Sequence, residues 1–417
     1  MTDGVDTGGA GTSGVDTGGL DTGGAEPLPL EGITVVAVEQ AVAGPLATRH
    51  LADLGARVIK IERPEEGDFA RAYDNSVHGL ASHFVWLNRG KESIELDLAS
   101  DHGLRVALDL ADRADVVISN LAPGAMERLG LGAAALRARR DQLVVVTISG
   151  YGDTGPYAGR KAYDMLVQAE SGLCSITGTP DAAAKTGVPV SDIATGMYAL
   201  SAVQSALFRR ERTGRGATVE VSMFEATAEW MGHPMYIRMY EGRQVGRMGL
   251  SHASICPYDA FPTRDGQVLI GVQNDRGWAA LVGDVLGRPE LVGDERYATN
   301  VARVARRTEV DELIGRLTAG YGSQELADKL DEFGVPAARL NDVAGLVDHP
   351  QLEARDRWRD FQTPAGPVRG LLPPMTFTDV ELPMGPVPAL GQHTDAILAE
   401  VAGQVRGEDT RHGTARG

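Results

Sequence analysis

The sequence predicts an α/β protein with a doubly wound large domain and a smaller α+β domain. Two observations support this fold class. Short β-branched runs alternate with helical patterns through the first half of the chain, which is typical of parallel strands joined by crossover helices. Past about residue 225 aromatic and methionine residues crowd together, and two strand-like runs flank the turn at residues 264–266. We therefore expect the segment after about residue 225 to form the smaller α+β domain.

The first predicted unit is a β-α-β motif. The β-branched run from Ile33 to Glu39 indicates a buried strand, and Arg57 to Glu62 indicates a second one. Between them, Pro45 suits the first turn of a helix and Gly55 suits its end. The alternation continues with helices expected over 104–111, near 124–129 and over 193–210, and strands expected over 116–119, 143–148 and 217–222.

Changes of composition predict the domain boundaries. Residues 1–28 repeat the motif GVDTGG and carry almost no large apolar side chains, so they are expected to form a disordered tail. We expect the large domain in residues 29–224, the small domain in residues 225–335 and a return to the large domain in residues 336–402. Residues 403–417 read as a second tail.

Charge and cysteine content exclude several classes of function. The 57 acidic residues outnumber the 40 basic ones, which argues against a general nucleic-acid binder. The two cysteines form no disulfide framework, and the nine histidines show no metal-ligand spacing, so no metal site is expected. No apolar run is long enough to span a membrane and no signal segment is recognisable, so a cytoplasmic location is expected.

The first strand-to-helix turn is the expected ligand crevice of a doubly wound fold. Its sequence, EQAVAGP, lacks the GxGxxG pattern, which argues against NAD or FAD and leaves a CoA-type nucleotide open. Lys60 and Arg63 end the second strand, and a basic turn follows at residues 87–91. These cations could hold phosphates at the crevice, or they could form a solvated basic surface.

Two aspartates precede apolar helical runs. Asp164 lies in AYDMLVQA and Asp192 lies in SDIATG. Local pattern alone favours helix N-caps at both positions, because Asp is a preferred capping residue. A catalytic carboxylate would instead need partial desolvation, a nearby oxyanion donor and substrate in line.

Taken in order, the motifs resemble those of the class III CoA-transferases, a superfamily that includes formyl-CoA transferase, carnitine CoA-transferase and the α-methylacyl-CoA racemases. The resemblance covers roughly residues 29–395 and rests on LEGITVV, AGPLATRHLADLGARVIKIERP, NRGKESIELDL, ISGYGDTGPY, AYDMLVQAESGL, DIATGMYAL and RTGRGATVEVSMFEA. It implies a Rossmann-like large domain, a small domain between its two parts, and an interlocked homodimer. It also implies acyl-CoA and carboxylic acids as substrates, with no tightly bound cofactor and no metal.

The resemblance assigns Asp164 as the nucleophile, which would carry CoA as an aspartyl thioester. The CoA contacts that it implies are Val42, Ala43, Arg63, Leu87, Asn88, Arg89, Gly90, Lys91, Asn120, Leu121, Arg128, Ser149, Gly150 and Tyr151. The substrate and loop positions are Tyr163, Asp192, Gly246, Gly249 and His252. Two positions depart from the pattern, because several transferases have Lys at the place of Ser149 and Arg at the place of Ala122.

Three functions remain open, with CoA transfer favoured. The racemases carry a His just before the aligned Asp, and this chain has Tyr163 there, whose high ordinary pKa suits proton transfer poorly. An α-methylacyl-CoA racemase and an inactive CoA-binding protein are the alternatives. Residues 230–261 resemble the subgroup acting on short dicarboxylic acids such as itaconate, mesaconate, citramalate or succinate, with succinyl-CoA as the expected donor. Candidate anchors for a second carboxylate are Arg238, Arg243, Arg247 and His252.

Overall fold

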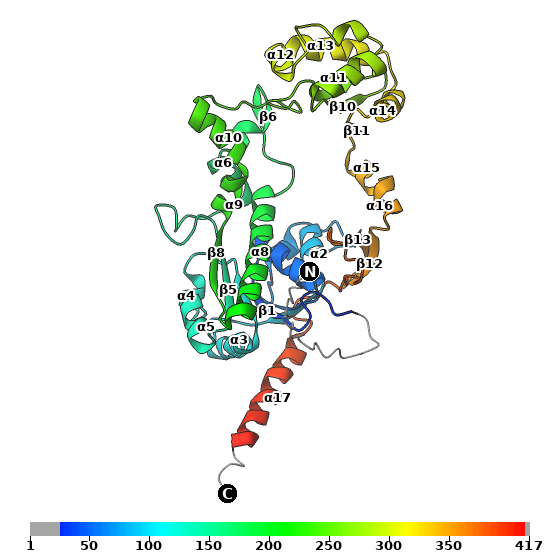
Figure 1. Cartoon of the computed structure of the whole chain (residues 1–417). Coiled ribbons are helices and arrows are strands. Elements are labelled where there is room, and N and C mark those ends of the chain that lie inside the picture. Colours follow the sequence, from blue (N-terminus) through cyan, green and yellow to red (C-terminus); the bar gives the residue numbers. More distant parts are fainter. Residues whose placement is uncertain (1–25, 413–417) are drawn as a thin grey trace, which may run out of the picture.

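A six-stranded parallel sheet forms the core of the larger part of the molecule, in the lower half of Figure 1. The computed structural model describes residues 26–412, so the tail predicted for residues 1–28 lies outside the described residues up to residue 25. The strand order is β3-β2-β1-β4-β5-β8, with every neighbouring pair parallel, which confirms the predicted α/β class. The strands are β1 (Thr34–Val38), β2 (Arg57–Glu62), β3 (Lys91–Glu95), β4 (Val116–Ser119), β5 (Val144–Ser149) and β8 (Thr218–Ser222).

Helices cover both faces of this sheet. Successive side chains of a strand point to opposite faces, so Val35 and Ala37 of β1 join one core while Val36 and Val38 join the other. The first core lies under α1 (Ala43–Asp53) and α8 (Val190–Thr213). The second lies under α3 (Asp101–Arg113), α4 (Ala125–Arg128), α5 (Ala133–Arg139) and α17 (Thr394–His412).

The contact between α1 and α8 is close because one residue there lacks a side chain. A Cβ atom on Gly196 of α8 would lie 2.8 Å from the carbonyl oxygen of Ala43, at the start of α1. Glycine therefore allows the beginning of α8 to approach the β1–α1 turn. The start of α8 also lies beside α6 (Asp164–Glu170), which α7 (Leu173–Ile176) and the short hairpin β6 (Gly178–Thr179) and β7 (Ala182–Ala183) follow.

A second unit has its own core, separate from the large sheet. It contains the antiparallel sheet β11-β10-β9, and Trp278 is the largest of its fully buried side chains. Its strands are β9 (Tyr258–Pro262), β10 (Gln267–Gly271) and β11 (Ala337–Arg339). Its helices are α11 (Asp275–Ala279), the π-helix η3 (Ala280–Val285), the 3-10 turn η4 (Pro289–Leu291), α12 (Asn300–Ala305), α13 (Arg307–Thr318) and α14 (Ser323–Glu332).

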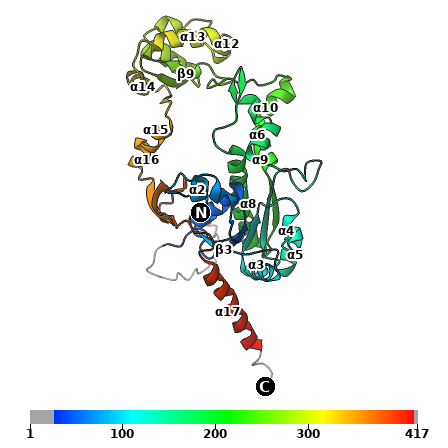
Figure 2. The ribbon, with the colours of Figure 1, turned by 180° about the vertical axis from the view of Figure 1, so that it is seen from behind.

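Two separate connections join the second unit to the large sheet (Figure 1, Figure 2). The outgoing one is α9 (Met223–Trp230), α10 (Gly232–Tyr236) and the π-helix η2 (Ile237–Glu241). The returning one is α15 (Val343–Val347), α16 (Pro350–Ala354) and the hairpin β12 (Trp358–Thr363) and β13 (Gly366–Leu371). The two connections are separated from each other in both views, so the chain forms a ring with an opening between them.

The ring is closed where Phe361 of β12 and Val368 of β13 pack on Phe84 and Val85 of α2 (Ser82–Asn88), and helix α17 then covers the edge of the large sheet. Ile397 is buried between α17, α3 and β3, and Thr394 Oγ1 accepts a hydrogen bond from the backbone amide of Glu95 in β3 (3.0 Å). The helix continues to His412, beyond Gly403, where the sequence reads as a tail. Gln404, Arg406 and Glu408 in this stretch are good helix formers. Within residues 26–412, no helix combines the length and apolar character needed to cross a membrane.

We expect Ile397→Ala to lower the free energy of unfolding by about 2–5 kcal/mol, because it opens a cavity between α17 and the large sheet. Ile397 is 1% exposed. Val301→Ala is the matched control, since Val301 is 79% exposed and its truncation leaves no cavity. Urea unfolding followed by circular dichroism measures both variants. Equal effects would contradict the role given to Ile397.

Candidate active site

Two cavities lie at the carboxyl end of the parallel sheet, around the point between β1 and β4 where the strand order reverses. This is where doubly wound folds bind ligands. The smaller, of about 300 Å³, is lined by residues at or just after the ends of β1, β2 and β3. The larger, of about 700 Å³, lies over the ends of β1, β4 and β5 and reaches the starts of α6 and α8.

Asp164 lies in the wall of the larger cavity, at the first position of α6. Its carboxylate does not cap its own helix, as local pattern would favour. Instead, Oδ1 accepts the backbone amides of Ser191 (2.8 Å) and Asp192 (3.3 Å) in the first turn of α8. Oδ2 accepts Nε2 of Gln168 (2.6 Å). The nucleophile predicted from the resemblance therefore has a fixed orientation.

The first turn of α8 faces this carboxylate. Helix α8 has 24 residues, and its N-terminal amides present partial positive charge to Oδ1 of Asp164. The same two amides can stabilise negative charge that develops on that oxygen during a reaction. Gly150 sits against Ala162, too close to accommodate a Cβ atom, so the segment leading to Asp164 packs directly on the end of β5.

Asp192 is a second carboxyl group in the same cavity wall. Burial raises the pKa of Asp192 to about 7, and the nearby negative charge of Asp164 adds to the rise. Tyr73 lines the cavity too, and burial raises its pKa to about 12, with further contributions from the charges of Asp68 and Asp192. Tyr73 therefore keeps its proton at neutral pH and can donate a hydrogen bond into the cavity, as Asp192 can in its protonated form.

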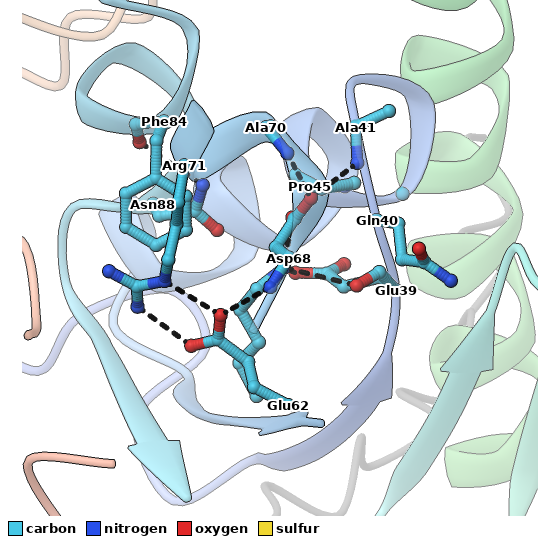
Figure 3. Close-up of polar contacts among 12 residues, drawn as sticks. Glu39, Gln40, Ala41, Pro45, Glu62, Asp68, Ala70, Arg71, Phe84 and Asn88 are labelled. Atoms are coloured by element: carbon cyan, nitrogen blue, oxygen red, sulfur yellow. Dashed lines mark hydrogen bonds and ion pairs between the residues drawn. The ribbon is translucent and has the colours of Figure 1, made fainter. Parts of the chain in front are cut away.

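A buried cluster of charges supports the β1–α1 turn that forms one side of both cavities (Figure 3). Glu39, at the end of β1, accepts hydrogen bonds from Lys91 (2.7 Å) and Thr48 (2.8 Å) and pairs with Lys60 (3.5 Å). Lys60 also pairs with Asp68 (2.8 Å), and all four charged groups are buried. Burial lowers the pKa of Lys91 to about 8, although the Glu39 carboxylate opposes that shift.

The cluster fixes the backbone of the turn itself. Figure 3 shows Asp68 beside the backbone amides of Ala41 and Ala70, with Glu62 held by Arg71. Asp68 Oδ1 accepts the amide of Ala41 (3.0 Å), and Glu62 accepts two hydrogen bonds from Arg71 (2.9 and 2.8 Å). The backbone of the turn at Ala41 is therefore held against Asp68, which pairs with Lys60 of β2.

The basic turn at residues 87–91 has a different place from the one that the resemblance implied. Leu87, Asn88, Arg89 and Lys91 are buried, and none of them lines either cavity. Arg89 makes two hydrogen bonds to Asp53 of α1 (2.9 and 2.8 Å). Gly90, with a φ of +75°, approaches Gly385 closely. In this structure the turn packs against α1 and the end of β1. The charge of Arg89 is neutralised by Asp53, and that of Lys91 by Glu39.

The other residues expected at the CoA site fall into three groups. Those in the wall of the larger cavity are Val42, Ala43, Asn120, Leu121, Ser149, Gly150 and Tyr163. Arg63 lines the smaller cavity and pairs with Glu66 on the surface (2.9 Å). Arg128 and Tyr151 line neither; Arg128 donates to the carbonyl of Pro123 (3.4 Å), and Tyr151 packs against Tyr157 and Phe224.

The expected loop residues lie away from Asp164 within one chain. Gly249 donates its amide to the carbonyl of Gly178 in β6 (2.8 Å), and His252 stacks on Tyr258 at the start of β9. Gly246, Gly249 and His252 line neither cavity. Burial lowers the pKa of His252, so its imidazole is neutral at pH 7.

Two residues with a clear place at the site were not predicted. Gln168 is fully buried and holds Asp164, and Lys185 lines the larger cavity. The spacing of Gln168 four residues after Asp164 puts both on one helix face, so this contact was readable from the sequence. Lys185 lies in an irregular segment that gives no periodic signal. In residues 26–412, no group of His, Cys, Asp and Glu side chains has the arrangement of a metal site.

Comparisons with known proteins agree with this geometry. The sequence profile of CoA-transferase family III matches residues 30–394. The chain is 37% identical to a succinate–glutarate CoA-transferase of Agrobacterium fabrum, over 89% of this chain and 96% of the relative. It is 34% identical to a succinyl-CoA:mesaconate CoA-transferase of Haloarcula hispanica, over 89% and 96%.

A solved structure shows the same fold. It is a CAIB/BAIF family protein of Brucella suis, with a TM-score of 0.80 and 37% identity, covering 90% of this chain and 100% of that one. The resemblance read from the sequence motifs is thereby confirmed over nearly the range that the motifs cover. The chain belongs to CoA-transferase family III.

Proposed function

We propose that the protein transfers CoA from succinyl-CoA to a short dicarboxylic acid through an aspartyl-CoA thioester on Asp164. The observation that carries the proposal is the oriented Asp164 carboxylate in the wall of a 700 Å³ cavity. The substrate class follows from the relatives, whose names give glutarate, mesaconate, citramalate and oxalate as acids. Which of these acids this chain uses is the open choice within the class.

The proposed reaction needs only a carboxylate and a thiolate. The Asp164 carboxylate attacks the thioester carbon of the donor, the C–S bond breaks, and a mixed anhydride and CoA thiolate form. The thiolate then attacks Cγ of Asp164 and releases the donor acid as a carboxylate, which leaves CoA on the enzyme as a thioester. The acceptor carboxylate reverses both steps. The amides of Ser191 and Asp192 lie where the oxyanion on Oδ1 would form in the attack on Cγ.

The two cavities together suit the two ends of CoA. The smaller one, with Arg63 at its edge, would take the nucleotide, and the larger one would take the thioester arm and the acids. Gln40 and Leu121 line both cavities, and Val42, Ala43 and Asn120 line the larger one. No tightly bound cofactor is required for these steps. A cytoplasmic location stays a prediction.

We also propose that two chains interlock as a homodimer, each passing through the open ring of the other. The returning connection supports this, because α15 presents Val343, Leu346 and Val347 with 76%, 51% and 53% of their surface exposed. The outgoing connection adds Tyr236, Met239 and Tyr240, exposed by 63%, 66% and 78%. Apolar surface of this extent on both connections favours burial against a second copy.

Asp164→Asn tests the mechanism. We expect it to lower the rate of CoA transfer by about a thousandfold or more, because the amide keeps the shape of the side chain but cannot form the thioester. Transfer is read by mass spectrometry with succinyl-CoA and glutarate, and the intermediate is trapped with hydroxylamine. Asp331→Asn, on an exposed helix of the small unit, is the matched control.

Full activity in the Asp164→Asn variant would overturn the mechanism. Hydrogen exchange at Cα of a 2-methylacyl-CoA without any acceptor acid would favour the racemase over transfer. If the wild type transfers CoA with none of the donor–acceptor pairs tested, an inactive CoA-binding protein is favoured.

Asp192→Asn tests the raised pKa. Wild type should lose stability relative to this variant as the pH rises from about 5 to 8, because the folded state binds the Asp192 proton more tightly than the unfolded state does. The effect is fully present below the ordinary carboxyl pKa and is lost as the pH passes about 7. Urea unfolding across this pH range measures it. Parallel profiles for the two proteins would show that Asp192 has an ordinary pKa.

Leu346→Glu tests the dimer. A charge on the exposed apolar face of α15 should weaken self-association about tenfold or more, because the carboxylate would be buried without a partner. Sedimentation velocity measures the mass across a concentration series. Val301→Glu places the same charge on an exposed valine of α12 and should leave association unchanged. A monomeric wild type would refute the interlocked dimer.

A further inference from the structure

The segment from Pro180 to Pro189 crosses beside the proposed active site and is called the strap below. Arg247 holds its first residues by donating hydrogen bonds to the carbonyls of Thr179 and Pro180 (3.0 Å each). Its last residues lead directly into α8. Two of its residues, Lys185 and Pro189, line the cavity that contains Asp164.

Gln168 ties the middle of the strap to the carboxylate of Asp164. Its Nε2 donates to Asp164 Oδ2 (2.6 Å), and its Oε1 accepts the backbone amide of Thr186 (3.0 Å). Gln168 is fully buried, so it makes both hydrogen bonds without competition from water. The backbone next to Lys185 therefore keeps a constant position relative to the proposed nucleophile.

Lys185 has a charge available for a ligand. Its ammonium group donates to the carbonyl of Thr186 (3.2 Å), and among the described residues no carboxylate lies within ion-pair distance of it. Two other cations line the same cavity, Arg160 and Lys161. Arg160 pairs with Glu170 (3.5 Å) and stacks on Tyr157. Lys161 precedes Ala162, which packs on Gly150 at the end of β5, on the side of the cavity nearer the sheet.

The arginines considered from the sequence as anchors are engaged elsewhere. Arg238 donates to the carbonyl of Gly242, Arg243 pairs with Glu241 (3.1 Å), and Arg247 holds the start of the strap. None of them, nor His252, lines the cavity of Asp164. Lys185 is therefore better placed than these four to meet a second negative charge near Asp164.

We propose that Lys185 binds the free carboxylate of the dicarboxylic acid while the other carboxylate reacts at Asp164. This inference rests on the proposed function and deepens it, since it names the residue that selects diacids. The free carboxylate stays ionised through the reaction, and leaving water without a counter-charge would be costly for it. An ammonium group in the same cavity as Asp164 removes that cost for a diacid and gives nothing to a monocarboxylic acid.

The test compares two acceptors of equal length. The aspartyl-CoA form of each enzyme is prepared with succinyl-CoA and freed of donor, and its decay is then followed with glutarate or with pentanoate. Pentanoate has a methyl group in place of one carboxylate. We expect Lys185→Ala to lower kcat/KM for glutarate about 10- to 100-fold, mainly through KM, and to leave pentanoate unchanged.

Two further variants sharpen the result. Lys185→Arg keeps the positive charge and should restore most of the preference for glutarate. Lys161→Ala removes the other cavity lysine and should change both acceptors by the same factor, so the ratio between them stays at the wild-type value. The pentanoate rate and the yield of thioester report in each variant whether Asp164 is still correctly held.

The outcomes separate this inference from the proposed function. An unchanged glutarate-to-pentanoate ratio in Lys185→Ala, or an equal loss with both acceptors, would overturn the role of Lys185 while CoA transfer through Asp164 stands. A wild type that uses pentanoate as well as glutarate would overturn it too. A wild type that forms no aspartyl thioester would overturn the proposed function and this inference with it.

Discussion

The structure depends on the burial of Glu39 between two lysine ammonium groups. Glu39 ends the central strand β1, and Lys60 and Lys91 reach it from the two neighbouring strands on one side. Removing one partner of such a buried group leaves an uncompensated charge and costs about 3–5 kcal/mol. Burial of the whole set adds little net stability, but it allows few alternative arrangements of the β1–α1 turn. The buried charges therefore fix the conformation of the β1–α1 turn, and this turn forms one side of both cavities.

Asp164 is likewise held by few contacts, and its partners come from two helices, α8 and its own helix α6. The two amides come from α8, whose start is set by its close crossing of α1, and the amide group of Gln168 comes from α6. The turn, the crossing and the carboxylate form one continuous set of contacts. A substitution in α1 that shifts α8 would therefore change the position of the amides that bind Asp164. Preorganisation of this kind is how a weak nucleophile such as a carboxylate gains reactivity.

The sequence predicted what depends on local pattern. Alternating apolar runs predicted the parallel strands, and the ordered motifs identified the family. The role of Asp164 that the motifs imply stays a prediction. It could not show that Lys91 and Arg89 face inward, because a basic turn looks the same whether its partners are phosphates or carboxylates from α1 and β1. It could not place Lys185, since the strap has no periodicity and its position comes from Gln168, 17 residues earlier. Contacts between elements decide both cases.

The covering of β3 by α17 and the residues before it has a consequence for biosynthesis. Strand β3 is the edge of the large sheet, and its covering contacts come from His393 and Thr394, about 300 residues later in the chain. A nascent chain that has already built the sheet still exposes this edge, and its ring is open. An exposed edge strand is a template for pairing with another chain. Chaperone protection would matter most in that interval, and a topologically linked pair of chains could still form then without either ring having to break.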